Sequence, residues 1–116
     1  MAKYLEFVLE DQNYAISVDD VRSVSQPHKI VRVPQAPNFV LGVTNCREQI
    51  MTVIDLKCLL GIPKICLYKS LFTINVYIGN SFYALLADDA LGVIDVNLHN
   101  TKQIKALDFK FIVLKK

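Results

Sequence analysis

Apolar and polar residues alternate over short stretches along most of the chain, and this period of two is typical of β-strands with one buried face. The first two stretches, residues 4–9 and 14–18, are separated by the polar residues 10–13. Two alternating stretches on either side of a short polar turn predict an N-terminal β-hairpin.

The remainder of the chain predicts more short strands and little helix. Further strands are expected at residues 29–33, 40–46, 50–54, 71–78, 82–87, 91–96 and 109–114. Residues 97–100 are expected to form a loop, and residues 64–70 a linker. A chain of about eight or nine short strands is typical of an all-β barrel or sandwich.

Two short helical turns interrupt these strands. One of the two aspartates at 19–20 can cap a turn that stacks Val21 on Val24. The second turn is expected at residues 55–60, because Gly61 stands where a helix commonly ends.

Composition restricts the class of protein. The 116 residues are 53% hydrophobic and 21% charged, with a formal net charge of +2. This balance favours one compact domain and excludes a disordered chain. A dedicated phosphate binder usually carries a basic stripe, whereas the basic residues here are scattered, so nucleic acid is not expected as a partner.

The uncharged residues 70–87 are the most membrane-like stretch. Gly79 and Asn80 interrupt this stretch near its middle, so a hairpin is expected there and no insertion into a membrane. Glu6 falls where a secretory signal would need an unbroken apolar run. The three cysteines form no C-x-x-C pair, and together these features predict a cytoplasmic protein with reduced thiols.

Candidate chemistry is sparse. Cys46 beside Arg47 could act as a nucleophile with His28 or His99 as its base, but a small half-buried hydrophobe explains Cys46 better. Asp88 and its neighbour point to opposite faces of an extended strand and form no carboxylate pair by themselves. The chain contains no glycine-rich phosphate loop, H-E-x-x-H or G-x-S-x-G motif. We therefore expect no enzyme, no cofactor and no metal site.

Apolar residues near the predicted turns remain as candidates for a binding surface. Val18, Val21 and Val24 surround the first helical turn, and Val43 precedes the Arg47 hairpin tip. Apolar anchors beside an arginine suit a protein-binding surface. The alternative is that these valines belong to the core and Arg47 is a solvated turn residue.

The order of several motifs is informative. They are YLEFVL at 4–9, YAI at 14–16, VRSV at 21–24, VPQAPNFVLGVTN at 33–45, VIDL at 53–56 and LGIP at 60–63. In this order they resemble the CheW-like family, and weaker matches continue to about Val96. The resemblance implies two small SH3-like β-barrels packed side by side in one domain, 1–116. We expect one subdomain at about 1–63 and a shortened, incomplete one at about 70–116.

The resemblance also implies a function and two binding surfaces. Family members are non-enzymatic adaptors that couple chemoreceptors to the histidine kinase CheA in bacterial chemotaxis. The residues expected to contact the regulatory domain of the kinase are Val18, Val21, Ser23 and Val24. Those expected at the cytoplasmic tip of a methyl-accepting chemoreceptor are Gly42, Val43, Arg47 and Ala84, the last beside a groove between the barrels.

Three departures from the family pattern leave alternatives open. Glu48 replaces the glycine that usually follows the hairpin arginine, and Ser23 replaces a common glutamate. Only residues 97–116 follow the last match, and a strand edge left open in a shortened barrel invites pairing as a homodimer. The alternatives are a divergent paralogue that serves another array or lacks one partner, and a small thiol-based binding or redox module.

Overall fold

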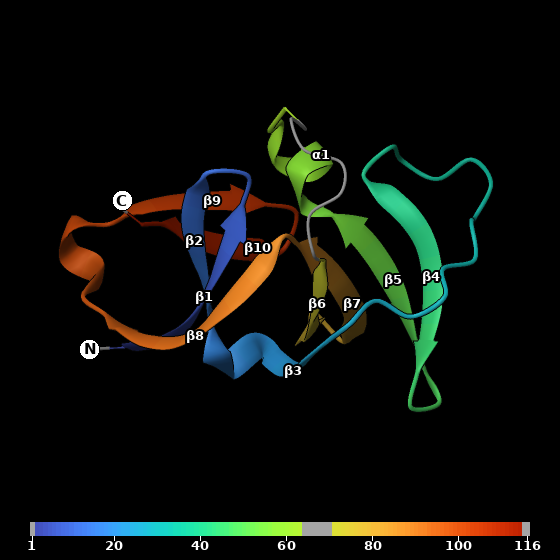
Figure 1. The fold of residues 1–116 in the computed structure, drawn as a ribbon, viewed down its shortest axis with the longest axis horizontal. Coiled ribbons are helices and arrows are strands. Elements are labelled where there is room, and N and C mark those ends of the chain that lie inside the picture. The colour runs from blue at the N-terminus through green and yellow to red at the C-terminus, as the bar shows by residue number, and fades with distance from the viewer. Residues whose placement is uncertain (1, 64–70, 115–116) are drawn as a thin grey trace.

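The structure, a computed structural model, describes residues 2–63 and 71–114. Ten strands in these residues form two five-stranded sheets that lie side by side (Figure 1). The first sheet contains, in spatial order, β8 (Asp89–Val96), β1 (Ala2–Leu9), β2 (Gln12–Ser17), β10 (Phe109–Val113) and β9 (Lys102–Ala106). The second contains β3 (Val21–Ser25), β6 (Phe72–Ile78), β7 (Ser81–Ala87), β5 (Gln49–Asp55) and β4 (Val40–Cys46). The all-β architecture is as expected.

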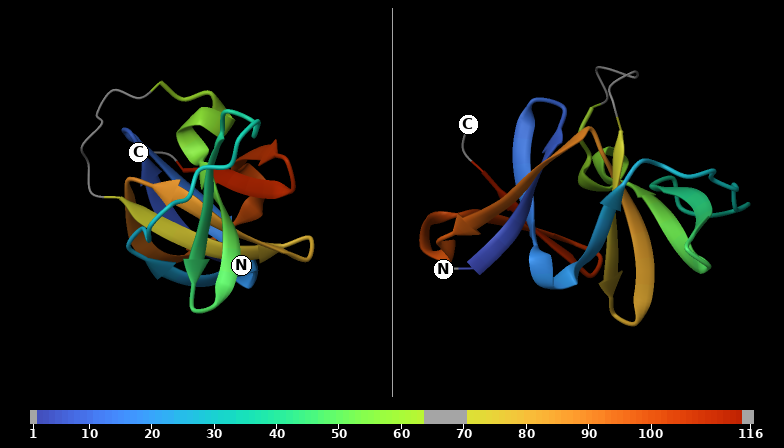
Figure 2. Two further views of the ribbon diagram at one scale, coloured as in Figure 1. Left: turned by 90° about the vertical axis from the view of Figure 1, so that its right-hand side faces the viewer. Right: turned by 60° about the horizontal axis from the view of Figure 1, so that its bottom comes forward.

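The sheets do not follow the expected division of the chain at residues 63–70. The N-terminal hairpin pairs with β8 and β10 from the end of the chain, while the second sheet comes from the middle. In Figure 2 the blue N-terminal strands accordingly lie among the orange and red C-terminal ones. The boundaries 1–63 and 70–116 were wrong because they assumed that neighbours in sequence share a sheet, whereas β2 pairs with a strand about a hundred residues away. The expected linker at 64–70 lies outside the described residues.

The first helical turn differs from its prediction. A 3₁₀ turn, η1 (Val18–Asp20), begins after Ser17, whose Oγ accepts from the Asp19 backbone N–H (3.2 Å). Val21 and Val24 then belong to β3 rather than to a helix. Their β-branched side chains favour an extended backbone, and pairing with β6 satisfies the main-chain groups.

The second helical turn is confirmed. Helix α1 (Leu56–Leu60) begins after Asp55, whose Oδ1 accepts from the Cys58 backbone N–H (3.4 Å). It ends at Gly61, which adopts a left-handed φ of 70°. This is the conformation that glycine permits at a helix C-terminus.

Two strand predictions need correction. The segment 29–33 contributes only one bridge, between Val31 and Val43, and otherwise crosses the surface as an irregular segment. Strand β9 was not expected, because its lysine-rich sequence leaves little apolar alternation on an exposed edge. Residues 97–100, expected as a loop, contain the 3₁₀ turn η2 (Leu98–Asn100).

The largest apolar cluster joins the two sheets. Its buried members from the first sheet are Leu5, Phe7, Leu9, Tyr14, Ile16, Phe109 and Phe111, and those from the second sheet and α1 are Ile54, Leu56, Ile74, Val76, Leu85 and Ala87. A smaller cluster around Ile112 belongs to the first sheet, and another around Val53 belongs to the second. The shared cluster makes the sheets one packing unit.

Candidate functional site

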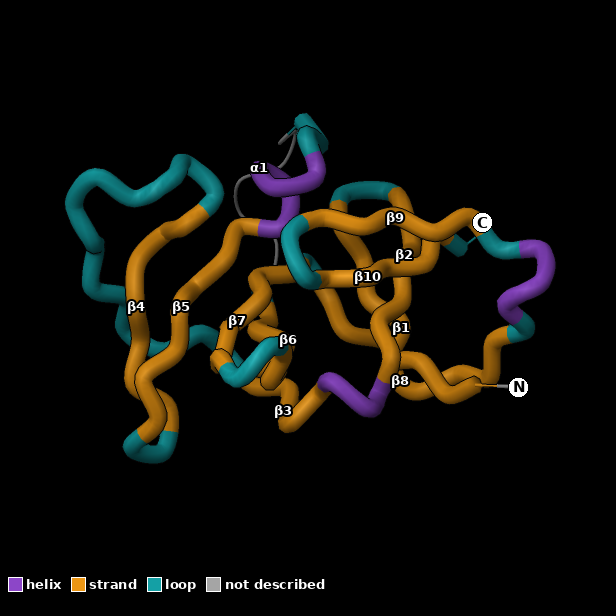
Figure 3. Tube along the Cα trace, turned by 180° about the vertical axis from the view of Figure 1, so that it is seen from behind, coloured by secondary structure: helices purple, strands orange, loops and turns teal. Residues whose placement is uncertain are grey.

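The β4–β5 hairpin forms one edge of the second sheet, and its tip projects from the body of the molecule as a two-stranded arm (Figure 3). Its register places one row of side chains across four segments: Val31 pairs with Val43, Val43 with Thr52, and Thr52 with Tyr83 of β7. Residues that pair directly across strands share a face of the sheet. We call these four residues the Val43 row.

The Val43 row is open at one end and anchored at the other. The Val31 side chain is 58% exposed, and Val43 and Thr52 are half-buried. Tyr83 packs edge-on against Phe109 of the first sheet, with ring centroids 5.0 Å apart. Ile50 lies on the same face two residues from Thr52 and is also 58% exposed. Exposed apolar side chains on a rigid sheet are typical of protein-binding surfaces.

Arg47 occupies the tip of this arm. Cys46 pairs with Gln49, so Arg47 and Glu48 form a two-residue turn, and both have a positive φ, 51° and 66°. Turns of this kind favour glycine or asparagine, and Glu48 takes the position where the family usually has glycine. The turn nevertheless forms and leaves the Arg47 side chain exposed.

The other two residues expected to bind the receptor lie beneath the surface. Ala84 is fully buried and packs with Met51 and Val53. Gly42 is buried under the segment 29–33. Neither residue can touch a partner directly in this arrangement, whereas Val31 and Ile50, which the sequence reasoning missed, are accessible. Alternation within β5 placed Ile50 on a strand but could not show that its face is uncovered.

Of the four residues expected to bind the kinase, Val18 lies in η1, and the other three lie on the two faces of β3. Val18 and Val21 are half-buried against the shared apolar cluster, and Val24 is 40% exposed. The Ser23 Oγ instead accepts from the Asn75 Nδ2 (3.0 Å), which is buried. Val24 is therefore the accessible apolar member of this group.

The thiol and metal hypotheses find little support in the geometry. Cys46 is half-buried and packs against the cluster of Met51, Val53 and Ala84, as expected for a small hydrophobe. His28 and His99 are both exposed. Residues 2–63 and 71–114 contain no group of three or more His, Cys, Asp or Glu side chains that could hold a metal ion. No helix in these ranges is long and apolar enough to cross a bilayer.

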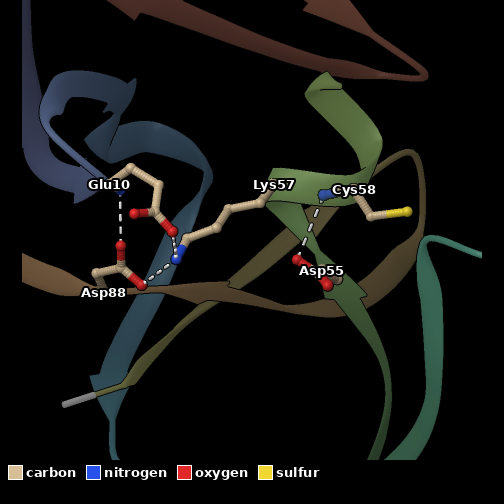
Figure 4. Close-up of polar contacts among 5 residues, drawn as sticks. All are labelled: Glu10, Asp55, Lys57, Cys58 and Asp88. Carbon is tan, nitrogen blue, oxygen red and sulfur yellow. Dashed lines mark hydrogen bonds and ion pairs between the residues drawn. The ribbon is translucent and has the colours of Figure 1, made fainter. Parts of the chain in front are cut away.

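A buried ionic triad connects α1 to the turn between β1 and β2 and to the residue between β7 and β8 (Figure 4). The Lys57 Nζ lies 2.7 Å from the Glu10 Oε1 and 2.7 Å from the Asp88 Oδ1. The Asp88 Oδ2 also accepts from the Glu10 backbone N–H (2.7 Å). The Lys57, Glu10 and Asp88 side chains are 10%, 9% and 3% exposed. Sequence reasoning missed this triad, since its members lie far apart along the chain.

Opposing effects act on the pKa of Lys57. Burial alone lowers the pKa of this ammonium group, but hydrogen bonds and charges from Asp88 and Glu10 raise it above its ordinary value of 10.5. Lys57 therefore stays charged near neutral pH. Asp88 thus has a structural role: its ion pair with Lys57 helps to hold α1 against the first sheet.

Comparison with known proteins identifies the family to which this fold belongs. The family model described as "CheW-like domain" matches residues 3–112. The chain belongs to the CheW-like domain family. A solved structure described as the scaffolding protein TtCheW from Thermoanaerobacter tengcongensis matches with a TM-score of 0.80 and 26% identity, over 98% of this chain and 89% of that one. This CheW-like domain therefore shares the two-barrel fold of that scaffold.

Curated relatives carry the same family name. The protein named chemotaxis protein CheW from Helicobacter pylori is 33% identical over 60 residues, which cover 52% of this chain and 36% of the relative. The protein of that name from Klebsiella aerogenes is 26% identical over 103 residues, covering 89% of this chain and 60% of the relative. The CheW-like domain thus spans between about a third and three fifths of the length of these relatives. Their names support membership of a scaffold and adaptor family in chemotaxis.

Proposed function

We propose that this CheW-like domain is a non-catalytic cytoplasmic adaptor of bacterial chemotaxis, which couples chemoreceptors to a CheA-type histidine kinase through protein contacts. The observation that carries the proposal is the partly exposed Val43 row, beside the hairpin tip that carries Arg47, on a CheW-like double barrel. The two candidate surfaces lie on different edge strands of the second sheet, β4 and β3. Two partners can therefore bind without competing for the same side chains.

The receptor is assigned to the β4–β5 arm. Val31, Val43 and Ile50 provide an apolar strip, and Arg47 provides a charged donor at its end. The cytoplasmic tip of a chemoreceptor is helical, and a helix binds such a strip through one apolar face. An exposed arginine at the rim adds specificity by pairing with a carboxylate of the partner.

Arg47→Ala should weaken binding of a receptor tip fragment about tenfold, the equivalent of roughly 1.4 kcal/mol, because it removes this rim charge. The thermal melt should change little, since the side chain is exposed. Calorimetric titration and a melt of the same preparation measure both quantities. A large loss of folding, with binding per folded molecule unchanged, would instead make Arg47 a structural residue.

The kinase regulatory domain is assigned to β3, where Val24 is the accessible anchor. Val18 and Val21 contribute a half-buried apolar base, and their substitution would disturb the shared cluster. Val24 faces the same side as its cross-strand partner Ile74 but lies at the exposed edge of the sheet. It therefore offers a cleaner test of this surface than Val21 does.

Val24→Asp should lower the affinity for a CheA regulatory domain about tenfold or more, because a carboxylate would replace an apolar anchor at the interface. Folding should be destabilised by less than about 1 kcal/mol, within the range of strand preferences. Leu107→Asp, at the exposed turn between β9 and β10, is the control and should bind normally. Equal binding by both variants and the parent would remove β3 from the proposal.

The inward position of Ser23 favours one alternative, a divergent paralogue with a reduced kinase contact. Family members commonly have glutamate here, whereas the Ser23 hydroxyl accepts a hydrogen bond from the Asn75 side chain within this chain. Separate pull-downs with the kinase domain and with the receptor fragment distinguish the two readings. Retention of the receptor alone would favour the paralogue.

Self-association through a strand edge belongs to the same proposal, at β8. Leu91 and Val93 are exposed on this edge strand of the first sheet. The other edge, β9, carries Lys102 and Lys105, and lysines discourage edge pairing.

A further inference from the structure

Gly42 lies where the chain crosses itself most closely. A Cβ added at Gly42 would stand 2.2 Å from the Val31 carbonyl oxygen and 3.0 Å from the Arg32 Cα, both of which are backbone atoms. Its φ of 151° is also one that residues with side chains rarely adopt. Only glycine lets the segment 29–33, which we call the strap, sit directly on β4.

The strap is held in this position by three hydrogen bonds. The Val31 N–H donates to the Val43 carbonyl (2.8 Å), and the Val43 N–H donates to the Val31 carbonyl (2.8 Å). The Thr44 Oγ1 donates to the Lys29 carbonyl (2.8 Å). In Figure 1 the strap is the cyan segment that leaves β3 and passes along β4. Its side chains are therefore displayed in a fixed position.

This arrangement extends the Val43 row by one segment. Neighbouring strands lie about 4.8 Å apart, so Val31, Val43 and Thr52 span about 10 Å, close to the diameter of one helix with its side chains. A surface pocket of about 530 Å³ follows the strap directly, and its lining includes Arg32, Val33 and Leu41. The pocket lining begins at Arg32, the residue that follows Val31 of the Val43 row, so the row and the pocket are neighbours on the surface.

Charge indicates what this surface would bind. Residues 26–50 contain three basic side chains, Lys29, Arg32 and Arg47, against one acidic side chain, Glu48. The formal charge of residues 26–50 is therefore +2, which equals the net charge of the whole chain. The basic and acidic side chains of the remaining residues cancel one another. An apolar strip with a basic border is complementary to a helix whose apolar face is flanked by carboxylates.

We propose that the strap is itself a receptor-binding element: Val31 and Arg32 contact an acid-flanked helix of the receptor tip, and Gly42 is a positioning residue that seats the strap. This inference rests on the proposed function and assigns Gly42 an indirect role in it. The strap, the Val43 row and Arg47 then form one continuous surface for a single helix.

The test is calorimetric titration of a chemoreceptor tip fragment into the full chain and its variants. Val31→Ser and Arg32→Ala should each weaken binding about five- to tenfold. Leu107→Ser, at the turn between β9 and β10, and Lys105→Ala, on β9, should stay within about twofold of the parent. Leu107 is a close match, since it is 54% exposed against 58% for Val31 and lies outside the proposed binding surfaces. Parent-like binding by both strap variants overturns the strap as a contact element.

Gly42→Ala tests whether Gly42 positions the strap. We expect faster amide exchange at Val31 and Val43, whose N–H groups hold the strap, and a loss of fragment binding at least as large as that of Val31→Ser. Binding of the kinase regulatory domain should stay within about twofold, because β3 is not touched. Normal fragment binding by Gly42→Ala overturns its positioning role. The strap variants keep the contact claim testable if Gly42→Ala fails to fold.

Two further outcomes separate the strap from the rest of the proposal. If the parent chain does not bind the fragment, the receptor half of the proposed function fails and the strap fails with it. If Arg32→Ala loses binding to vesicles of anionic phospholipid but keeps the fragment, the basic border serves a membrane surface and the proposal is overturned.

Discussion

Lys57→Met should lower the free energy of unfolding by about 3–5 kcal/mol, because it leaves two buried carboxylates without their cation. Glu10 and Asp88 lie 2.7 Å from the Lys57 Nζ, and all three side chains are at most 10% exposed. Methionine fills a similar volume, so the loss reflects unpaired charge rather than a cavity. Chemical denaturation followed by circular dichroism measures it.

Lys3→Met is the control for this prediction. Lys3 forms a pair with Asp95 at 3.0 Å, but its side chain is 65% exposed, and such pairs contribute at most about 1 kcal/mol. A Lys57→Met loss no larger than that of Lys3→Met would contradict a role for the triad. Adding Asp88→Asn to Lys57→Met should recover part of the loss, because one unpaired charge is removed.

The pH dependence of the triad has a defined sign. The pKa of Lys57 is raised in the folded protein, so the native state holds this proton more tightly than the unfolded state does. The stabilisation from Lys57 is therefore complete below pH 10.5 and is lost as the pH rises through its folded pKa. Burial also raises the pKa of Tyr14, but that contribution cancels when parent and Lys57→Met are compared. The difference between them should shrink in alkaline solution.

Phe109→Ala should lower the free energy of unfolding by a similar amount, about 3–5 kcal/mol, because it opens a cavity in the cluster that the two sheets share. Phe109 is 1% exposed and contacts Tyr83 of the second sheet across a 5.0 Å ring separation. The loss should therefore appear at the same denaturant concentration in both sheets. Amide exchange of β1 and β6 residues, read separately, checks this coupling.

Val93→Ala is the control for Phe109→Ala, since that side chain is 59% exposed and its truncation should change stability by less than about 0.5 kcal/mol. Separate transitions for the two sheets would mean that they fold independently. One transition for both would mean that the partner surfaces on β3 and β4 are carried by one rigid body. A rigid body suits an adaptor, because two partners are then held in a fixed relation.

Much of the local structure was accessible from the sequence. Period-two alternation identified most strands, and Asp55 and Gly61 marked the ends of α1. The motif VPQAPNFVLGVTN, with those on either side, indicated the CheW-like family that the match over residues 3–112 bears out. These features depend on residues near one another in the chain, where backbone preference and side-chain period act directly.

Tertiary structure alone decided which strands share a sheet and which side chains reach the surface. Ala84 is buried and Ser23 turns inward, although their strands were expected, because exposure depends on what packs over each face. The triad of Glu10, Lys57 and Asp88 and the contact of the strap with Gly42 join residues that are distant in sequence. Alternation states that a strand has two faces, but only the pairing of remote strands determines which face meets the core and which meets a partner.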